Sequence, residues 1–272
     1  MTELYDTSQF LWVEGPLSTL ERLCLASFLH HGYTVHLYTY GEVTGVPEGV
    51  VQISGEEILP RELVFSAPGV MGQSFASFAD LFRLELLVQR GGWWFDMDMV
   101  CIRHLPPPKQ LTFASTWEGE WGECAVNCAM WCLPGDPYLK ELSLRAQSII
   151  RSGEVAFGSL GPFLLQALIR ERNLEVYVAP WTEFCPYPWR MVPRLALPGP
   201  LAYAKDRIRM FKHVLWQRNS PTFRAGYLRS NSRTIHLHNE IWKSSNLDKD
   251  GSYSYFSPIE TLKRQYLFGL DT

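Results

Sequence analysis

The sequence has no basic surplus, no long apolar run and few cysteines, and each absence excludes a class of protein. Lysine and arginine total 25 against 28 acidic residues, for a net charge of −3, whereas nucleic-acid-binding proteins usually carry excess positive charge. No stretch approaches the roughly 20 apolar residues that span a bilayer. The first eight residues lack the basic and apolar regions of a secretory signal. We therefore expect a cytoplasmic protein without a nucleic-acid partner or a transmembrane segment, and peripheral membrane contact stays open.

The cysteines are too few for a disulfide scaffold. Six cysteines in 272 residues are typical of a reducing compartment. Cys124, Cys128 and Cys132 recur every fourth residue, which would align them on a helix, whereas structural zinc sites usually start from a Cys-x₂-Cys pair. We therefore expect all six to be buried structural residues.

The beginning of the chain is typical of a parallel α/β sheet. Apolar spacing predicts a buried strand over residues 8–13, a helix over 17–31 and a second strand over 33–39. A strand, a helix and a strand within about 30 residues form a βαβ unit. In such sheets, ligands bind beyond the carboxyl ends of the strands.

The rest of the chain alternates strands and helices without a linker or an internal repeat. We expect strands over 50–53, 93–101, within 111–135 and over 234–238, and helices over 75–90, 137–152, 162–170 and 257–267. The segment 180–232 is rich in Pro, Trp and Arg and gives no clear pattern. One domain over residues 1–272 is the expected organisation.

Asp96 and Asp98 are the most specific feature of the sequence. They follow the bulky residues 93–95, which places them at the end of a buried strand, and alternate residues of an extended segment point the same way. Neighbouring buried carboxylates repel each other unless a cation or hydrogen-bond donors neutralise them. Oxygen ligands suit Mg²⁺ or Mn²⁺. The pair therefore indicates a metal that carries a diphosphate, with two exposed loop acids as the alternative.

The preceding helix carries a second pair of charges. Asp80 and Arg83 lie three residues apart and share a helix face, among apolar neighbours over residues 78–86. Charges in such a helix are usually paired or face a ligand. Because the helix leads through Gly91 and Gly92 to the acid pair, both charges could face the same crevice. A surface ion pair is the alternative.

Polar residues gather again near the end of the chain. His236 and His238 alternate on a predicted strand, and Asn239 and Glu240 follow. Two histidines, an amide and an acid could complete a metal shell, although polar packing at a strand end is the alternative. Trp12, at the end of the first strand, could stack on a nucleobase or fill the core.

The order of these motifs resembles a known family. Residues 78–83 (Phe-Ala-Asp-Leu-Phe-Arg) and 91–98 (Gly-Gly-Trp-Trp-Phe-Asp-Met-Asp) are similar to the DXD-containing sugar-binding region of family 32 glycosyltransferases. That group includes yeast-type α-mannosyltransferases and bacterial capsule or lipopolysaccharide transferases. Residues 236–242 are similar to the family's His-Leu-x-Asn-x-x-Trp ending. The similarity covers residues 8–105 and 232–245, and the middle matches loosely, through Asn127 and residues 161–162.

The resemblance implies a GT-A fold, a Rossmann-like mixed α/β sheet flanked by helices. Residues 8–110 would bind the nucleotide sugar, and residues 111–272 would form the acceptor side and the C-terminal metal segment. The implied activity is a hexosyltransferase-type reaction of polysaccharide biosynthesis, from a UDP- or GDP-sugar to a glycan or glycoconjugate. It implies Mn²⁺ or Mg²⁺ as cofactor.

The resemblance also implies a role for each candidate residue. The implied catalytic residues are Arg83, Asp96 and Asp98. The implied nucleotide-sugar-binding residues are Trp12, Asp80, Arg83, Asp96, Asn239 and Trp242. The implied metal ligands are Asp96, Asp98 and His236, with His238 as the alternative to His236.

Relatives of this type retain anomeric configuration, and the sequence offers no obvious carboxylate as a covalent nucleophile. A front-face transfer is therefore the expected mechanism. Two other functions remain open: a metal-dependent phosphohydrolase, which would lack the additional clustered ligands of two-metal sites, and a non-catalytic module that binds nucleotide sugars or carbohydrate.

Overall fold

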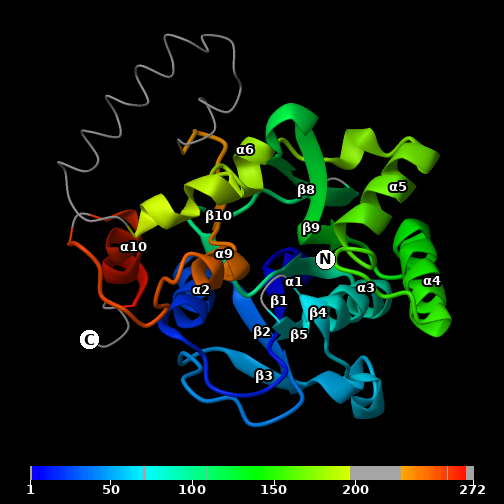
Figure 1. Ribbon diagram of the computed structural model, residues 1–272, viewed down its shortest axis with the longest axis horizontal. Coiled ribbons are helices and arrows are strands. Elements are labelled where there is room, and N and C mark those ends of the chain that lie inside the picture. Colours follow the sequence, from blue (N-terminus) through cyan, green and yellow to red (C-terminus); the bar gives the residue numbers. More distant parts are fainter. Residues whose placement is uncertain (1, 70–71, 109, 197–227, 256, 268–272) are drawn as a thin grey trace.

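The computed structural model describes residues 2–69, 72–108, 110–196, 228–255 and 257–267. These residues form a mixed six-stranded sheet in the order β3-β2-β1-β6-β9-β8 (Figure 1). Its strands are β1 (Thr7–Leu11), β2 (Thr34–Thr39), β3 (Val51–Ser54), β6 (Gly92–Phe95), β8 (Leu111–Trp117) and β9 (Glu123–Cys132). The first four are parallel to one another, and β9 is antiparallel to β6 and β8. The predicted α/β class with a Rossmann-like mixed sheet is confirmed.

The predicted βαβ unit is also present. Helix α2 (Thr19–His30) connects β1 to the parallel strand β2. The side chain of Ser18 accepts a hydrogen bond from the backbone of the first turn, and the Ser18 N–H donates to Glu21 at 3.0 Å. This reciprocal capping box fixes the start of the helix, which is why α2 begins at Thr19 and not at Leu17.

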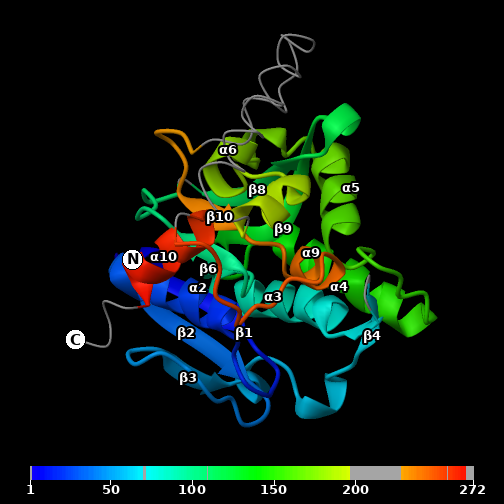
Figure 2. The same cartoon turned by 60° about the vertical axis from the view of Figure 1, so that its left-hand side comes forward.

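Helices cover both faces of the sheet (Figure 2). Helices α3 (Ala76–Arg90), α4 (Pro137–Ser152) and α5 (Pro162–Arg172) pack with one face, and α2 and α6 (Trp181–Phe184) pack with the other. Strand β6 shows the alternation: Trp94 packs near Phe82 of α3, whereas Phe95 packs near Phe28 of α2. Successive side chains of a strand point to opposite faces, so both faces of β6 are buried.

A third layer joins the end of the chain to α2. Strand β7 (Met99–Cys101) leaves the main sheet and pairs antiparallel with β10 (Thr234–His236). Helices α9 (Asn239–Ser244) and α10 (Pro258–Tyr266) follow, and their apolar residues pack with the outer side of α2 and with a 3₁₀ helix, η5 (Trp189–Leu195). The pairing of β7 with β10 brings the C-terminal histidines to the acid pair.

The remaining elements are short. They are α1 (Thr2–Tyr5), the hairpin of β4 (Ala67–Gly69) and β5 (Gly72–Ser74), and 3₁₀ turns at Gly55–Glu57, Arg61–Leu63, Gly119–Trp121 and Glu175–Tyr177. Helix α3 ends at Gly91, whose φ is +63° and where an added Cβ would lie 2.6 Å from Pro134. Only glycine fits that position. In the described part of the chain, no helix is long and apolar enough to cross a membrane.

Three expectations from the sequence need correction. The strand expected over 93–101 is divided by a turn into β6 and β7, and the strand expected over 234–238 ends at His236. Cys124, Cys128 and Cys132 lie on strand β9, and Cys124 is only partly buried. Of the segment 180–232, residues 181–195 contain α6 and η5, and residues 197–227 lie outside the described part. The single-domain organisation stays a prediction.

Candidate active site

The order of the parallel strands reverses between β1 and β6. The chain proceeds outward from β1 through β2 to β3, and β6 then takes the other side of β1. In open α/β sheets, ligands bind beyond the carboxyl ends of the strands at such a switch point. Trp12 follows β1 and Asp96 follows β6. The topology therefore brings these two predicted site residues to the same edge of the sheet.

The segment from Asp96 to Asp98 is a turn, and not the extended strand that the alternation predicts. The Asp96 N–H donates to the Cys128 carbonyl at 2.8 Å, and the Met99 N–H donates back to the Asp96 carbonyl at 3.1 Å. The turn forms because the chain leaves the sheet here to pair with β10. The two carboxylates therefore converge through the turn.

The C-terminal segment meets the turn directly. The register of β7 and β10 sets His236 opposite Met99, and the Leu237 N–H donates to the Asp98 carbonyl at 2.8 Å. His236 Nε2 lies 3.2 Å from Asp98 Oδ1 as an ion pair. One ligand atom each from Asp96, Asp98 and His236 lies within 4.8 Å of the other two. The structure thus brings together the three residues predicted as metal ligands.

His238, the alternative ligand, takes a different position. Its φ of +53° ends the strand, and it precedes α9, which the sequence pattern did not predict. Its ring stacks on that of His236, with 3.7 Å between centroids. The geometry therefore favours His236 as the ligand, with His238 packed behind it.

The charges of the site are strongly coupled. Burial opposes the ionisation of Asp98, but His236 outweighs it and holds the Asp98 pKa well below its usual range. Burial lowers the pKa of His236, yet Asp98 raises it well above the usual value. The pKa of His238 is lowered well below normal by burial and by the charge of His236. The electrostatics of the site therefore favour the charged forms of Asp98 and His236 and the neutral form of His238.

Several buried polar atoms of the site have no hydrogen-bond partner in the described part of the chain. These are Asp98 Oδ1, which has only its ion pair with His236, Asn239 Oδ1 and His238 Nε2. The Asn239 N–H already donates to Asp98 Oδ2 at 2.8 Å. Unpartnered buried polar atoms are costly, and a bound cation or ligand would satisfy them. The donor set, two carboxylates and an imidazole, fits Mn²⁺ or Mg²⁺.

Arg83 is buried among the residues with which it forms ion pairs and hydrogen bonds. Its side chain is 5% exposed and forms ion pairs with Asp80 at 3.0 Å and Asp96 at 2.9 Å. It also donates to the Asn127 carbonyl at 2.5 Å, and its guanidinium carbon lies 5.0 Å from the centre of the Trp94 ring. A guanidinium offers five donors in a fixed fork. Most of them serve this network, so the geometry suits a residue that positions the acids.

Asp80 is held from three sides. Besides Arg83, the Asn127 side-chain amide donates to its carboxylate at 2.8 Å. Gly161, at the start of α5, approaches so closely that an added Cβ would lie 2.5 Å from Asp80 Oδ2. Burial raises the pKa of Asp80 to about 6, against the opposing effect of Arg83. Asn127 is therefore a site residue that the candidate set omitted, and the loose family match at Asn127 was its only signal.

The two candidate tryptophans differ in position. Trp12 is partly buried at the switch point, and its Nε1 donates to the Gly15 carbonyl at 3.3 Å. Trp242, which the resemblance places in the nucleotide-sugar site, is instead fully buried in the C-terminal layer, and its Nε1 donates to the Leu237 carbonyl. A ring without exposed surface cannot stack on a ligand. The expectation for Trp242 is thus corrected to a core role.

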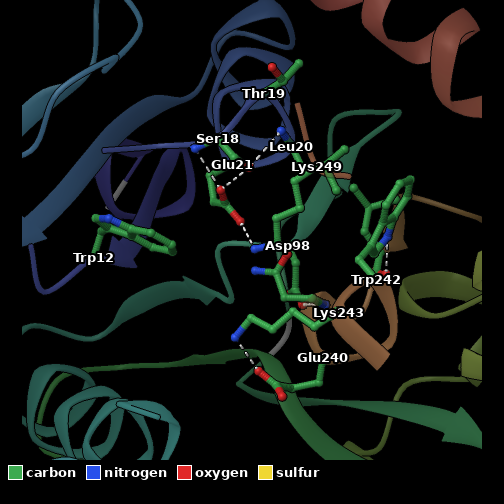
Figure 3. A network of polar contacts seen from close by, with 12 residues as sticks. Trp12, Ser18, Thr19, Leu20, Glu21, Asp98, Glu240, Trp242, Lys243 and Lys249 are labelled. Carbon is green, nitrogen blue, oxygen red and sulfur yellow. Dashed lines mark hydrogen bonds and ion pairs between the residues drawn. The ribbon is translucent and has the colours of Figure 1, made fainter. Parts of the chain in front are cut away.

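An ion pair fastens the C-terminal segment next to the site (Figure 3). Lys249 Nζ lies 2.6 Å from Glu21, the capping residue of α2, whose side chain is 1% exposed. Asp250 accepts hydrogen bonds from the backbone and the side chain of Thr19. Figure 3 shows Asp98 between this contact and helix α9. The start of α2 and the segment after α9 are therefore joined beside Asp98.

Known proteins give one sequence match and several weak structural likenesses. No curated protein sequence matches the chain significantly. Solved structures with partial likeness include PaToxG glycosyltransferase (12% identity, 97% of this chain and 84% of that one, TM-score 0.46). The UDP-bound glycosyltransferase domain of the YGT toxin is 10% identical, over 64% of this chain and 79% of that one, with a TM-score of 0.45. The catalytic domain of alpha-toxin from Clostridium novyi is 9% identical, over 96% of this chain and 82% of that one, with a TM-score of 0.39.

The sequence match covers the residues that form the site. Residues 64–117 match a family model described as a glycosyltransferase sugar-binding region containing a DXD motif. The matched segment includes Asp80 and Arg83 on α3 and the acids of the turn after β6. Over residues 64–117, the chain is therefore similar to the DXD-containing sugar-binding region of glycosyltransferases.

Proposed function

We propose that the protein is a metal-dependent, retaining hexosyltransferase of the family 32 type. Its donor would be a UDP- or GDP-sugar, and its acceptor a glycan or glycoconjugate. One observation carries the proposal: ligand atoms of Asp96, Asp98 and His236 converge at the switch point of the sheet, and buried atoms of the neighbouring His238 and Asn239 have no hydrogen-bond partner among the described residues. That arrangement needs a cation, and a nucleoside diphosphate supplies the anionic partner for one.

The metal would lie between Asp96, Asp98 and His236. When bound, it would offset the negative charge that develops on the diphosphate as the bond to the sugar breaks. His236 would have to lose the proton that Asp98 now stabilises, because only neutral imidazole ligates a metal. Asn239, whose backbone N–H fixes Asp98, would hold that carboxylate in its ligating position.

The remaining residues would orient the donor. Trp12 presents a partly buried ring at the sheet edge, which suits stacking against the nucleobase. Asp80, fixed by Asn127, is placed to accept hydrogen bonds from ribose or sugar hydroxyls. Arg83 would act as a positioning residue, since its ion pairs set the orientation of both Asp80 and Asp96.

The geometry supports a front-face transfer. A covalent route would need a carboxylate free to attack the anomeric carbon, but Asp80 and Asp96 are both held by Arg83, and Asp98 is paired with His236. The acceptor hydroxyl would then attack from the side on which the diphosphate leaves. A trapped glycosyl-enzyme adduct would exclude this mechanism.

A thermal-shift screen of UDP- and GDP-sugars, with and without Mn²⁺, tests the proposal. A ligand that binds the folded state raises the melting temperature according to its occupancy. We expect the sugars of one nucleotide to raise the melting temperature only when Mn²⁺ is present. In Asp98→Asn, added Mn²⁺ should no longer change the melting temperature measured with that donor. Transfer to glycan acceptors is then measured with the selected donor.

The two alternative functions predict other outcomes. A phosphohydrolase would release phosphate from simple esters and transfer no sugar. A non-catalytic module would bind the nucleotide sugar without turnover of any donor and acceptor pair. Undiminished transfer by Asp98→Asn with Mn²⁺ supplied would contradict the metal assignment itself.

A further inference from the structure

The two ring nitrogens of His236 face different sets of ligands. Nε2 faces the carboxylate of Asp98 at 3.2 Å. Nδ1 faces the other way, toward the thiol of Cys185 at 3.9 Å, and that sulfur lies 3.6 Å from the sulfur of Cys128. One ligand atom each from Cys128, Cys185 and His236 lies within 4.8 Å of the other two. A second group of metal-ligating atoms therefore adjoins the carboxylate site.

The spacing of this second group fits a tetrahedral zinc site. With Zn–S of about 2.3 Å and Zn–N of about 2.0 Å, two sulfurs of a tetrahedron are about 3.8 Å apart, and a sulfur and a nitrogen are about 3.5 Å apart. The structure has 3.6 Å between the sulfurs and 3.9 Å between Cys185 Sγ and His236 Nδ1. Adjustments of a few tenths of an ångström would admit the ion.

The fold also supplies the outer partner that a ligating histidine requires. A metal-bound imidazole usually donates its other ring N–H to a carboxylate, which fixes its orientation. For an ion on Nδ1 of His236, that carboxylate is Asp98, opposite Nε2. The same ring can thus serve either of two metals, one through each nitrogen.

A nucleophilic role does not suit these thiols, although Cys185, His236 and Asp98 stand in the order of a catalytic triad. Cys128 is 2% exposed and Cys185 is fully buried, so neither sulfur can reach a substrate. The hydrogen bond with Cys185 and burial raise the pKa of Cys128 well above its usual value, whereas nucleophilic thiols have lowered pKa values.

We propose that Cys128, Cys185 and Nδ1 of His236 form a soft-metal site that binds Zn²⁺ next to the carboxylate site. The ligands come from β9, from the residue after α6 and from the end of β10. Because Zn²⁺ would draw His236 toward the thiols and leave the Nε2 proton facing Asp98, Zn²⁺ would weaken the binding of Mn²⁺ to the carboxylates. The proposal does not depend on sugar transfer.

Cobalt absorption under reducing conditions tests this site without any measurement of activity. Co²⁺ bound by thiolates gives an intense near-ultraviolet charge-transfer band, which oxygen ligands do not give. We expect the band in the wild-type protein, its displacement by Zn²⁺, and its loss in Cys128→Ser and Cys185→Ser. Each substitution removes a direct ligand. It should therefore lower the affinity for Co²⁺ by more than the about 10–100-fold that follows the loss of a hydrogen-bond partner of a ligand.

Two variants serve as controls. Cys132→Ser changes a buried thiol on the same strand whose one hydrogen bond among the described residues is to the Leu87 carbonyl, so the cobalt band of this variant should match that of the wild type. Asp98→Asn should keep the band at saturating Co²⁺ while abolishing Mn²⁺ binding, which separates this site from the proposed function. Added Zn²⁺ should weaken Mn²⁺ binding more in wild type than in Cys185→Ser, where Zn²⁺ competes at the carboxylate site alone.

The proposal is overturned if wild-type protein that binds Mn²⁺ shows no thiolate band, or if Cys132→Ser loses the band as fully as Cys128→Ser. Should a serine variant fail to fold, X-ray absorption of the zinc-loaded wild type decides. Two sulfurs at about 2.3 Å support the site, and a shell of oxygen and nitrogen alone contradicts it.

Discussion

Arg83 and His236 are the buried basic residues that pair with the acids of the site. Arg83 is buried between Asp80 and Asp96, and His236 is buried against Asp98. A buried charge that loses its partner is far more costly than an exposed one. The two residues should therefore affect stability and metal binding in ways that an exposed ion pair does not.

Replacement of Arg83 by glutamine should lower the free energy of unfolding by about 3–5 kcal/mol, because Asp80 and Asp96 lose their shared cation inside the protein. Arg90→Gln on the same helix is the matched control. Its ion pair with Glu57 is half-exposed, and such pairs contribute about 0–1 kcal/mol. Urea unfolding of both variants measures the difference, and equal losses would show that Arg83 does not organise the acids.

Binding of Mn²⁺ should release a proton near pH 7. Burial lowers the pKa of His236 but Asp98 raises it further, so we expect a protonated imidazole in the metal-free protein at pH 7, whereas the ligating form is neutral. Below that raised pKa, the apparent affinity should rise up to about tenfold for each pH unit, and it should level off above it. Calorimetry in two buffers of different ionisation enthalpy counts the proton.

His236→Gln is the control for this coupling, because glutamine has no proton to lose in this range. It should bind Mn²⁺ more weakly and with an affinity that changes little between pH 6 and pH 8. If the wild-type protein binds Mn²⁺ without proton release, His236 is not the ligand.

At the scale of elements, close approach between helices sets the position of Asp80. Gly161, the residue before helix α5, lies directly against the carboxylate of Asp80 on α3. Gly161→Ala would place a methyl group 2.5 Å from Asp80 Oδ2. We expect a loss of about 1–3 kcal/mol, as overpacked sites usually show, together with weaker donor binding.

A double-mutant cycle separates this clash from other effects of the methyl group. In an Asp80→Ala background, the obstructing oxygen is absent, so Gly161→Ala should cost much less there. An unchanged cost in that background would mean that the contact with Asp80 is not the reason for glycine.

The elements also show how far the sequence could predict the fold. Local patterns predicted helix α2 without its cap, the parallel pair β1 and β2, and helix α3 with the glycine that follows it. They failed where a distant partner decides the conformation. The turn at Asp96 to Asp98 forms because β7 pairs with β10, and α9 follows a left-handed His238 that no periodicity reveals.

The same limit applies to the site. Asp80 and Arg83, with Asp96 and Asp98, lie within one short segment and could be proposed from their spacing. The pairing of Cys128 with Cys185, across 57 residues, could not. The expectation for Trp242 was wrong because a tryptophan in a sequence motif can either stack on a ligand or fill the core. Here the ring is in the core, and its N–H donates to the Leu237 carbonyl.

At the scale of the whole molecule, the site lies where an early segment of the chain meets a late one. The turn after β6 supplies the acids, the end of β10 supplies His236, and the start of α9 supplies Asn239. The ion pair between Lys249 and Glu21 fastens that segment to the beginning of α2. Loss of this contact should therefore lower both the free energy of unfolding and the affinity of the site for Mn²⁺.

Lys249→Met tests this connection. It leaves the buried carboxylate of Glu21 without its cation, so we expect a loss of about 3–5 kcal/mol in unfolding free energy and weaker Mn²⁺ binding. Glu21→Gln in the same chain removes the unpaired charge, so the double variant should recover much of the stability. Asp250→Asn is the control, since its bonds to Thr19 are exposed and should matter little. A double variant no more stable than Lys249→Met alone would show that the loss comes from packing and not from the charge of Glu21.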